Sequence, residues 1–168
     1  MMKKNIKFLI MDVDGTLTDG KIYMGENGEL FKAFDIKDGC GIKDILPQYG
    51  VIPIIITART SKILINRCNE LGIENLHQGV RDKIGKLNEI IKQKSEEDVK
   101  EYNYSHCAYI GDDILDLQCM EPIKKAGGVV ACPADAVKSV KAVSDFICTK
   151  NGGDGAVREF IEWLLRNV

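Results

Sequence analysis

Residues 7–16 read KFLIMDVDGT, a short apolar run followed at once by two aspartates and a glycine. The apolar run predicts a β-strand over Lys7–Asp12 that is buried on both faces, as strands of parallel sheets are. Ligands of such sheets bind beyond the carboxyl ends of the strands. Asp12 and Asp14 stand at that position, and Gly15 lets a ligand approach the backbone closely. The two carboxylates are therefore the first candidates for a functional site.

Five further apolar runs follow along the chain, and amphipathic helical segments separate them. This alternation predicts a Rossmann-like α/β fold, in which a central parallel sheet carries helices on both faces. One predicted helix face consists of Ile42, Ile45, Leu46 and Tyr49, and the face of the last helix consists of Val157, Phe160, Ile161 and Leu164. The further strands are expected at Val51–Thr57, Asn75–Gln78, Cys107–Gly111, Gly128–Ala131 and Phe146–Cys148.

Residues 21–34 break the alternation and predict a β-hairpin flap directly after the first strand. Two short runs flank Glu26-Asn27-Gly28, and Asn-Gly is a strong hairpin turn signal. The hairpin carries more apolar side chains than a solvated hairpin needs. Because a two-stranded ribbon is marginally stable alone, we expect another surface to cover it.

The composition limits the classes of function. The 168 residues, 45% of them hydrophobic, fit one globular domain over 1–168. The net charge is −2 and no run of five like charges occurs, so neither a nucleic-acid partner nor a membrane surface is indicated. No apolar run reaches the ~20 residues of a membrane span or the roughly 7–15 of a secretory signal. We therefore expect a cytoplasmic protein whose six cysteines, none in a CxxC pair, are free thiols.

A second acidic cluster follows the strand expected at 107–111. It contains Asp112 and Asp113, with Asp116 one helical turn later. Carboxylates at the ends of two parallel strands would repel each other unless a cation lay between them, and hard oxygen ligands suit Mg²⁺. Taken alone, Asp112 and Asp113 are also typical of a helix N-cap.

Two further polar groups are expected at the ends of strands. Residues 57–61 read TARTS and offer hydroxyls, a cation and a helix N-terminus, a combination that suits a phosphate. Capping of the next helix by Thr60 or Ser61 is the simpler interpretation of the same residues. Lys83 begins a later helix, where it opposes the macrodipole. Either an anion holds it there or it is a solvated surface lysine.

Together these positions resemble the four motifs of the haloacid dehalogenase (HAD) superfamily of phosphatases. The matches are Asp12-x-Asp14-Gly15-Thr16, Thr57, Lys83 and Gly111-Asp112-Asp113-x-x-Asp116, in the order of that superfamily. The resemblance implies the HAD fold and an aspartyl-phosphate intermediate formed on Asp12. It also implies Asp14 as general acid and base, and Thr57 and Lys83 as groups that bind the phosphoryl oxygens.

The same resemblance implies Mg²⁺ as the cofactor. Its ligands would be the Asp12 carboxylate, the Asp14 carbonyl oxygen and Asp112, with Asp113 orienting a ligand or water. Thr16 and Arg158 are further candidates for contact with the substrate.

The chain resembles the HAD group that has no cap domain, because the hairpin is the only insert after the first motif. Within this group it is similar to the 3-deoxy-D-manno-octulosonate 8-phosphate phosphatases of lipopolysaccharide biosynthesis and to nonulosonate 9-phosphate phosphatases. The resemblance implies hydrolysis of a phosphorylated sugar acid. The matching segments are Thr18-Asp19-Gly20, Phe34-x-x-Lys37-Asp38-Gly39 and Gly152-Gly153-Asp154-Gly155-Ala156-Val157-Arg158-Glu159.

The residues near the motifs favour the octulosonate and leave an alternative open. Arg59 resembles the octulosonate enzymes, in which an arginine can face the sugar carboxylate. Residues 78–83 are closer to the nonulosonate pattern. Ala58 replaces the usual glycine of the family, and Asp154 stands where octulosonate enzymes usually have lysine. A KDN or N-acylneuraminate 9-phosphate is therefore the alternative substrate.

The resembled enzymes are tetramers whose glycine-rich C-terminal segment reaches a neighbouring subunit. We therefore expect a homotetramer in which Arg158 serves the substrate or a neighbouring carboxylate, although 152–155 can also be a plain loop. A non-catalytic tetramerisation domain, of the type linked to cytidylyltransferases, is the non-enzyme alternative. All four motifs are intact, which favours the enzyme. A phosphotransferase or phosphomutase would need a cap to exclude water.

Overall fold

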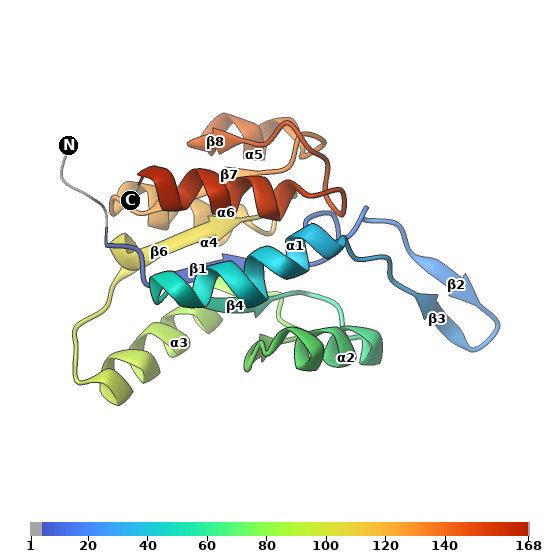
Figure 1. The fold of residues 1–168 in the computed structure, drawn as a ribbon, viewed down its shortest axis with the longest axis horizontal. Coiled ribbons are helices and arrows are strands. Elements are labelled where there is room, and N and C mark those ends of the chain that lie inside the picture. The colour runs from blue at the N-terminus through green and yellow to red at the C-terminus, as the bar shows by residue number, and fades with distance from the viewer. Residues whose placement is uncertain (1–4, 168) are drawn as a thin grey trace.

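The computed structural model describes residues 5–167 (Figure 1). Residues 1–4 and 168, which the expected domain includes, lie outside the described residues. The main sheet has the strand order β5-β4-β1-β6-β7-β8, and every neighbouring pair in it is parallel. All six predicted strands occur, each within one residue of its predicted bounds. They are β1 (Phe8–Met11), β4 (Ile52–Ile56), β5 (Asn75–His77), β6 (Cys107–Ile110), β7 (Val129–Cys132) and β8 (Phe146–Ile147).

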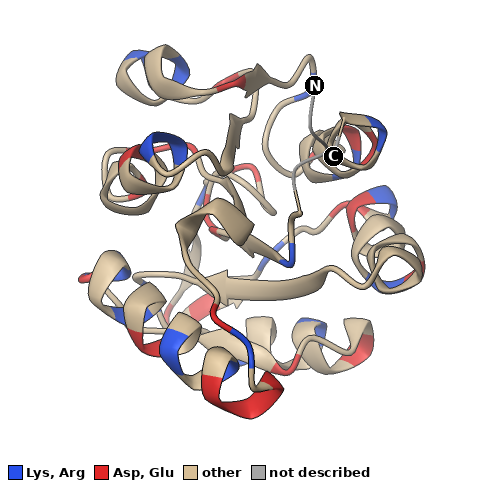
Figure 2. Cartoon of the chain, turned by 90° about the vertical axis from the view of Figure 1, so that its left-hand side faces the viewer, with Lys and Arg blue, Asp and Glu red and all other residues tan. Residues whose placement is uncertain are grey.

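Helices cover both faces of this sheet, as predicted. One layer contains α1 (Ile36–Cys40), α2 (Lys62–Leu71) and α6 (Ala156–Asn167), and the other contains α3 (Lys83–Asp98), α4 (Leu117–Lys125) and α5 (Lys138–Val143). The central strand β1 is buried at every position, because Leu9 and Met11 pack with the first layer while Phe8 and Ile10 pack with the second. Charged residues lie mainly on the helices and loops around the apolar strands (Figure 2).

The segment 36–49 is helical throughout but changes its helix type. After α1 come a π-helical turn, Gly41–Ile45, and a 3₁₀ turn, Leu46–Tyr49. The prediction of this face assumed a uniform α-helix. A π-helical turn is wider than an α-helical turn, so the residues after it face a different side of the helix. Ile42 and Leu46 are buried as predicted, whereas Tyr49 is 62% exposed, so the prediction was wrong for Tyr49. The predicted face of α6 is fully buried.

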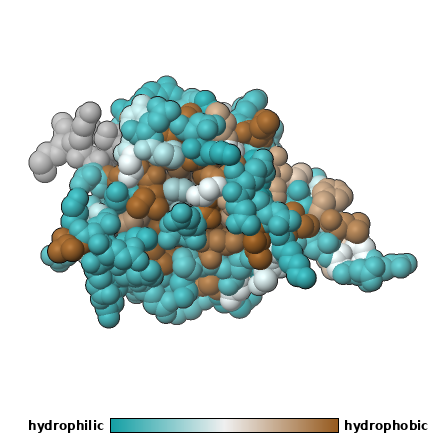
Figure 3. Space-filling view, turned by 60° about the horizontal axis from the view of Figure 1, so that its bottom comes forward, coloured by the Kyte–Doolittle hydropathy of each residue, from teal (hydrophilic) through white to brown (hydrophobic). Residues whose placement is uncertain are grey.

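The predicted hairpin is confirmed as β2 (Tyr23–Gly25) and β3 (Gly28–Phe31), an antiparallel pair that extends away from the α/β body (Figure 1). It is shorter than predicted, and its register shifts between Tyr23 and Met24. The rings of Tyr23 and Phe31 stack across the strands at 4.3 Å. Apolar side chains such as Met24 and Leu30 are exposed on it, and Figure 3 shows hydrophobic residues along the projection.

The glycine-rich segment before α6 packs against the loop that follows β1. A Cβ atom on Gly152 would lie 1.9 Å from the carbonyl oxygen of Gly15, and one on Gly153 would lie 2.6 Å from the Asp19 nitrogen. The Gly153 N–H donates to the Thr16 carbonyl oxygen at 3.1 Å. These glycines therefore allow two backbone segments to touch, and the C-terminal segment braces the first motif within one chain.

None of the helices in residues 5–167 is long and apolar enough to cross a membrane. All six cysteines are free, as predicted, and five of them are buried, whereas Cys40 is exposed. Burial raises the pKa of the Cys107 thiol to about 12, so that thiol stays protonated at neutral pH.

Candidate active site

The predicted motif residues gather around one pocket of about 220 Å³ at the carboxyl ends of β1, β4 and β6. Parallel strands bring their carboxyl ends to one edge of the sheet, so residues far apart in sequence meet there. Thr57, directly after β4, is almost fully buried and lines this pocket. The complete lining is Asp12, Asp14, Thr57, Ala58, Arg59, Lys83, Asp113, Leu115 and Asp116.

The loop after Asp12 is a tight turn in which the N–H groups of residues 16–18 all donate to the Val13 carbonyl oxygen. Gly15 adopts φ +97°, and a Cβ atom there would lie 2.1 Å from the Asp112 carboxylate. The buried Thr16 hydroxyl donates to Asp112 at 2.9 Å. Thr16 therefore joins the first motif to the fourth, and its expected contact with the substrate stays a prediction.

Asp116 is an anchor whose two carboxylate oxygens accept four hydrogen bonds. One oxygen accepts from Lys83 Nζ and from the Tyr109 hydroxyl, both at 2.7 Å. The other accepts from the backbone N–H groups of Asp112 and Asp113, at 2.9 and 3.1 Å. Because Asp116 is buried and all its hydrogen bonds are made, it fixes the turn that carries Asp112 and Asp113.

Lys83 is a buried cation, and the interpretation as a solvated surface lysine was wrong. The residue is 1% exposed, and its Nζ lies 2.8 Å from Asp12 and 2.7 Å from Asp116. Burial alone would lower the pKa of this lysine, but the two carboxylates outweigh burial and raise it. The side chain therefore keeps its charge, since a buried lysine needs paired carboxylates to do so.

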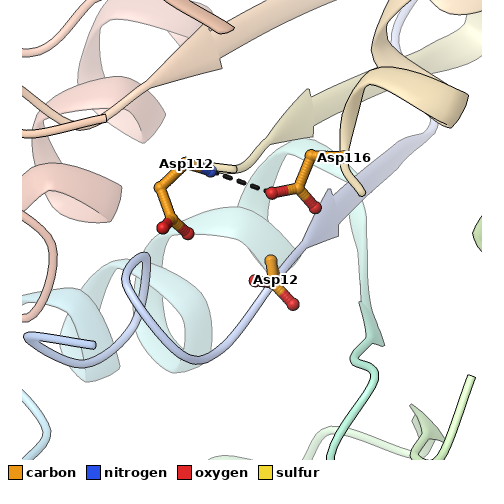
Figure 4. A group of neighbouring side chains, drawn as sticks. All are labelled: Asp12, Asp112 and Asp116. Carbon is orange, nitrogen blue, oxygen red and sulfur yellow. Dashed lines mark hydrogen bonds between the residues drawn. The ribbon is translucent and has the colours of Figure 1, made fainter. Parts of the chain in front are cut away.

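The carboxylates at this edge carry more negative charge than Lys83 balances. One oxygen from each of Asp12, Asp112 and Asp116 lies within 4.8 Å of the others (Figure 4). Burial, and then repulsion by Asp116, raises the pKa of Asp12 to about 6. Burial, and then repulsion by Asp12 and Asp116, raises the pKa of Asp112 to about 8.

This arrangement fits a divalent cation with oxygen ligands. Acidic groups whose pKa values are raised by their neighbours gain from a nearby positive charge, and Mg²⁺ prefers carboxylate and carbonyl oxygens. Asp116 is saturated by its four donors, which leaves Asp12 and Asp112 as the carboxylates to hold such an ion. Asp113 is exposed and lines the pocket, where it can orient a ligand or water.

The sequence did not identify two further charged residues at the site, Glu29 and Lys32. Glu29 lies on β3 of the hairpin, and Lys32 directly follows that strand. Lys32 Nζ contacts an oxygen of Asp14, and it lies 3.0 Å from Glu29. The hydroxyl of Ser61 donates to Glu29 at 2.5 Å. Ser61 occupies the N-cap position of α2, one of the two expected, but its side chain makes no capping bond there.

The two arginines predicted to contact the substrate lie in different places. Arg59 lines the pocket, with Nε 3.7 Å from Asp14 and one terminal nitrogen 3.4 Å from Glu29. Arg158 belongs to α6, and its side chain pairs with Glu162 at 2.6 Å. Its backbone N–H donates to Asp38 at 2.7 Å, which joins α6 to α1.

Comparison with known proteins identifies the class first. No protein-family model matches the sequence. A solved HAD-superfamily hydrolase of Legionella pneumophila has 33% sequence identity and a TM-score of 0.87, over 98% of this chain and 84% of that one. With the parallel sheet and the converging motifs, this likeness defines the protein as a hydrolase of the HAD superfamily.

Two further relatives define the family. The 3-deoxy-D-manno-octulosonate 8-phosphate phosphatase KdsC of Escherichia coli K12 is 38% identical over 162 residues, which cover 96% of this chain and 80% of the relative. The crystal structure of that phosphatase from Moraxella catarrhalis, in complex with magnesium, phosphate and KDO, has 41% identity and a TM-score of 0.87, over 98% and 88% of the two chains. The chain belongs to the family of 3-deoxy-D-manno-octulosonate 8-phosphate phosphatases, and the resemblance stated from its motifs is confirmed.

The raised pKa values predict that Mg²⁺ stabilises the protein more at high pH. A carboxyl group whose folded pKa is raised stabilises the fold at low pH, and this stabilisation is lost as the pH rises through the folded pKa. The loss begins near the usual carboxyl pKa of about 4 and is complete near pH 6 for Asp12 and near pH 8 for Asp112. A bound cation removes the repulsion, so saturating Mg²⁺ should raise the melting temperature by roughly 5–10 °C at pH 8 and by much less at pH 5.5.

The measurement is thermal unfolding with Mg²⁺ or with EDTA at both pH values. Asp112→Asn should lose most of the pH-dependent part of the Mg²⁺ effect, whereas Asp44→Asn, at an exposed position, should retain it. An equal Mg²⁺ effect at pH 5.5 and pH 8 would contradict the prediction.

Proposed function

We propose that this chain is a Mg²⁺-dependent phosphatase that hydrolyses 3-deoxy-D-manno-octulosonate 8-phosphate to the free sugar acid and phosphate. One observation carries the proposal: in a member of this family, Asp12, Asp14, Thr57 and Lys83 line a single pocket. Arg59 also lines it and supplies a cation for an acidic substrate.

In the first half of the reaction the phosphoryl group moves to Asp12. A carboxylate oxygen of Asp12 attacks phosphorus, and the bond between phosphorus and the sugar oxygen breaks. Asp14 gives its proton to that sugar oxygen, so the sugar leaves as a neutral alcohol. Lys83 lies 2.8 Å from the nucleophile and, with Thr57, binds the phosphoryl oxygens while charge builds up on them.

In the second half water releases the phosphate. Asp14, now a carboxylate, removes a proton from a water molecule, whose oxygen attacks the phosphorus of the aspartyl-phosphate. The bond to Asp12 breaks, and the starting state returns with Asp14 protonated. Asp12, the Asp14 carbonyl oxygen and Asp112 would hold Mg²⁺, which would supply positive charge beside the phosphoryl oxygens.

Loss of the nucleophile tests this mechanism. Asp12→Asn should lower phosphate release more than about 1000-fold with the fold intact, because an amide cannot form the acyl-phosphate. EDTA should stop the wild-type enzyme, and Mg²⁺ should restore it. Phosphate release and circular dichroism provide the readouts, with Asp44→Asn as the control. Near-wild-type turnover by Asp12→Asn would refute the covalent mechanism.

Arg59 is proposed to bind the carboxylate of the sugar acid. A charge-assisted contact of this kind is worth about 1.5–3 kcal/mol, so Arg59→Ala should lower kcat/KM for the sugar-acid phosphate about 10–100-fold. A neutral sugar phosphate should lose less than about 3-fold. Arg166→Ala, at the exposed end of α6, is the control. Equal losses on the acidic and the neutral substrate would show that Arg59 serves the phosphate or the fold.

The eight-carbon and nine-carbon substrates can be separated with the same assay. We expect kcat/KM to be higher for the octulosonate 8-phosphate than for a nonulosonate 9-phosphate, in line with Arg59 and with the family. The reverse order would favour the nonulosonate alternative.

We also propose a homotetramer in which Arg158 completes a neighbouring site. The support is the exposed apolar surface of the hairpin, which includes Ile22, Met24, Leu30 and Phe31. Light scattering should give four times the chain mass of 18.7 kDa. Inactive Asp12→Asn and Arg158→Ala chains, mixed and reassembled, should recover part of the activity, because some sites then contain both intact residues. A fully active monomer would contradict the assembly.

A further inference from the structure

The hairpin places a buried lysine on the expected general acid. The Lys32 side chain is 2% exposed, and its Nζ contacts Asp14 Oδ1. Lys32 is not among the residues that line the pocket, so within the described chain it reaches the site through Asp14. A lysine is buried at this depth only when carboxylates hold its charge, so the contact between the two side chains constrains both of them.

A second carboxylate holds Lys32 in place. Glu29 Oε1 lies 3.0 Å from Lys32 Nζ and 3.4 Å from a terminal nitrogen of Arg59. Glu29 Oε2 accepts from the Ser61 hydroxyl at 2.5 Å. The carboxylate of Glu29 is therefore fixed from the hairpin side and from the start of α2. Lys32 is consequently anchored independently of Asp14.

These contacts leave Asp14 between two cations. Lys32 contacts Oδ1, and Arg59 Nε lies 3.7 Å from Oδ2. Arg59 is half-exposed and has another role in the proposed function. Within residues 5–167, the ion pairs of Lys32 are those with Glu29 and Asp14. The orientation of the Asp14 carboxyl group thus depends chiefly on Lys32.

We propose that Lys32 is a positioning residue for proton transfer by Asp14, an inference that rests on the proposed function. A general acid must lie within hydrogen-bond reach of the leaving oxygen, and a displacement of about 1 Å can cost roughly 100-fold in rate. Glu29 holds Lys32, and Lys32 holds Asp14. The hairpin therefore sets the position of the acid, while the sheet sets the position of the nucleophile.

The test compares phosphate esters whose leaving groups differ in how much they need a proton from a general acid. The 4-nitrophenolate of p-nitrophenyl phosphate leaves with little proton donation, whereas the sugar-acid phosphate and simple alkyl phosphates need it. The ratio kcat/KM reports the steps up to phosphoryl transfer to Asp12, so it excludes the later attack of water. In Lys32→Met, kcat/KM should fall about 10–100-fold for the unactivated esters and less than about 3-fold for p-nitrophenyl phosphate.

Two matched variants separate positioning from folding. Lys21→Met removes a lysine of the same segment that is 74% exposed, and it should leave both classes of ester unchanged. Glu29→Gln removes one anchor of Lys32. It should also lower kcat/KM more for the unactivated esters than for p-nitrophenyl phosphate, by a smaller factor than Lys32→Met does. If Lys32→Met shows no cooperative thermal unfolding and is therefore misfolded, Glu29→Gln provides the same comparison. Lys32→Arg keeps the charge and should restore part of the loss on unactivated esters.

The outcomes distinguish the two proposals. Equal losses on activated and unactivated esters, or no loss on either, would overturn the positioning role of Lys32. A wild-type enzyme that releases no phosphate from any of these esters in the presence of Mg²⁺ would instead overturn the proposed function.

Discussion

Mutual repulsion of buried carboxylates at one edge of the sheet is the constraint on which the site depends. Asp12, Asp112 and Asp116 meet there because parallel strands end together. Lys83 balances part of this charge from inside the fold, between Asp12 and Asp116. Burial and then the remaining negative charge raise the pKa values of Asp12 and Asp112. The same excess that destabilises the metal-free fold therefore provides the attraction for a divalent cation.

Close backbone packing keeps these carboxylates in place. Gly15 leaves room for the Asp112 carboxylate, and Gly111 leaves room for that of Asp116, which a Cβ atom would approach to 2.3 Å. Gly152 lets the C-terminal segment touch Gly15 from the other side. Three separate parts of the chain thus meet closely, because these glycines themselves carry no side chain. This explains why glycines lie beside the acidic residues of both motifs and before α6.

Local patterns predicted most of the fold and the centre of the site. Continuous apolar runs identified the strands, and the residues after them had to share an edge, so Asp12 and Thr57 could be placed together from the sequence. Lys83 joined them only through the resemblance to the HAD motifs. Tyr49 could not be placed, since the π-turn before it depends on packing. Glu29 and Lys32 were missed for another reason. On a hairpin they read as solvated charges, and only its tertiary position brings them to Asp14.

Two carboxylates only two residues apart are therefore held by different parts of the molecule. Lys83 holds Asp12 and is itself held by Asp116, and both belong to the α/β body, whose core is rigidly packed. Lys32, which Glu29 anchors, holds Asp14; Glu29 lies on β3 and Lys32 directly follows it, in a projecting ribbon that has few contacts with the body. A two-stranded ribbon is weakly stable by itself, so contacts that steady it also steady the acid. Attack by the nucleophile depends on the body alone, whereas proton transfer depends in addition on how the ribbon is seated. Any surface that covers the exposed apolar residues of the ribbon consequently acts on the acid–base group before it acts on the nucleophile.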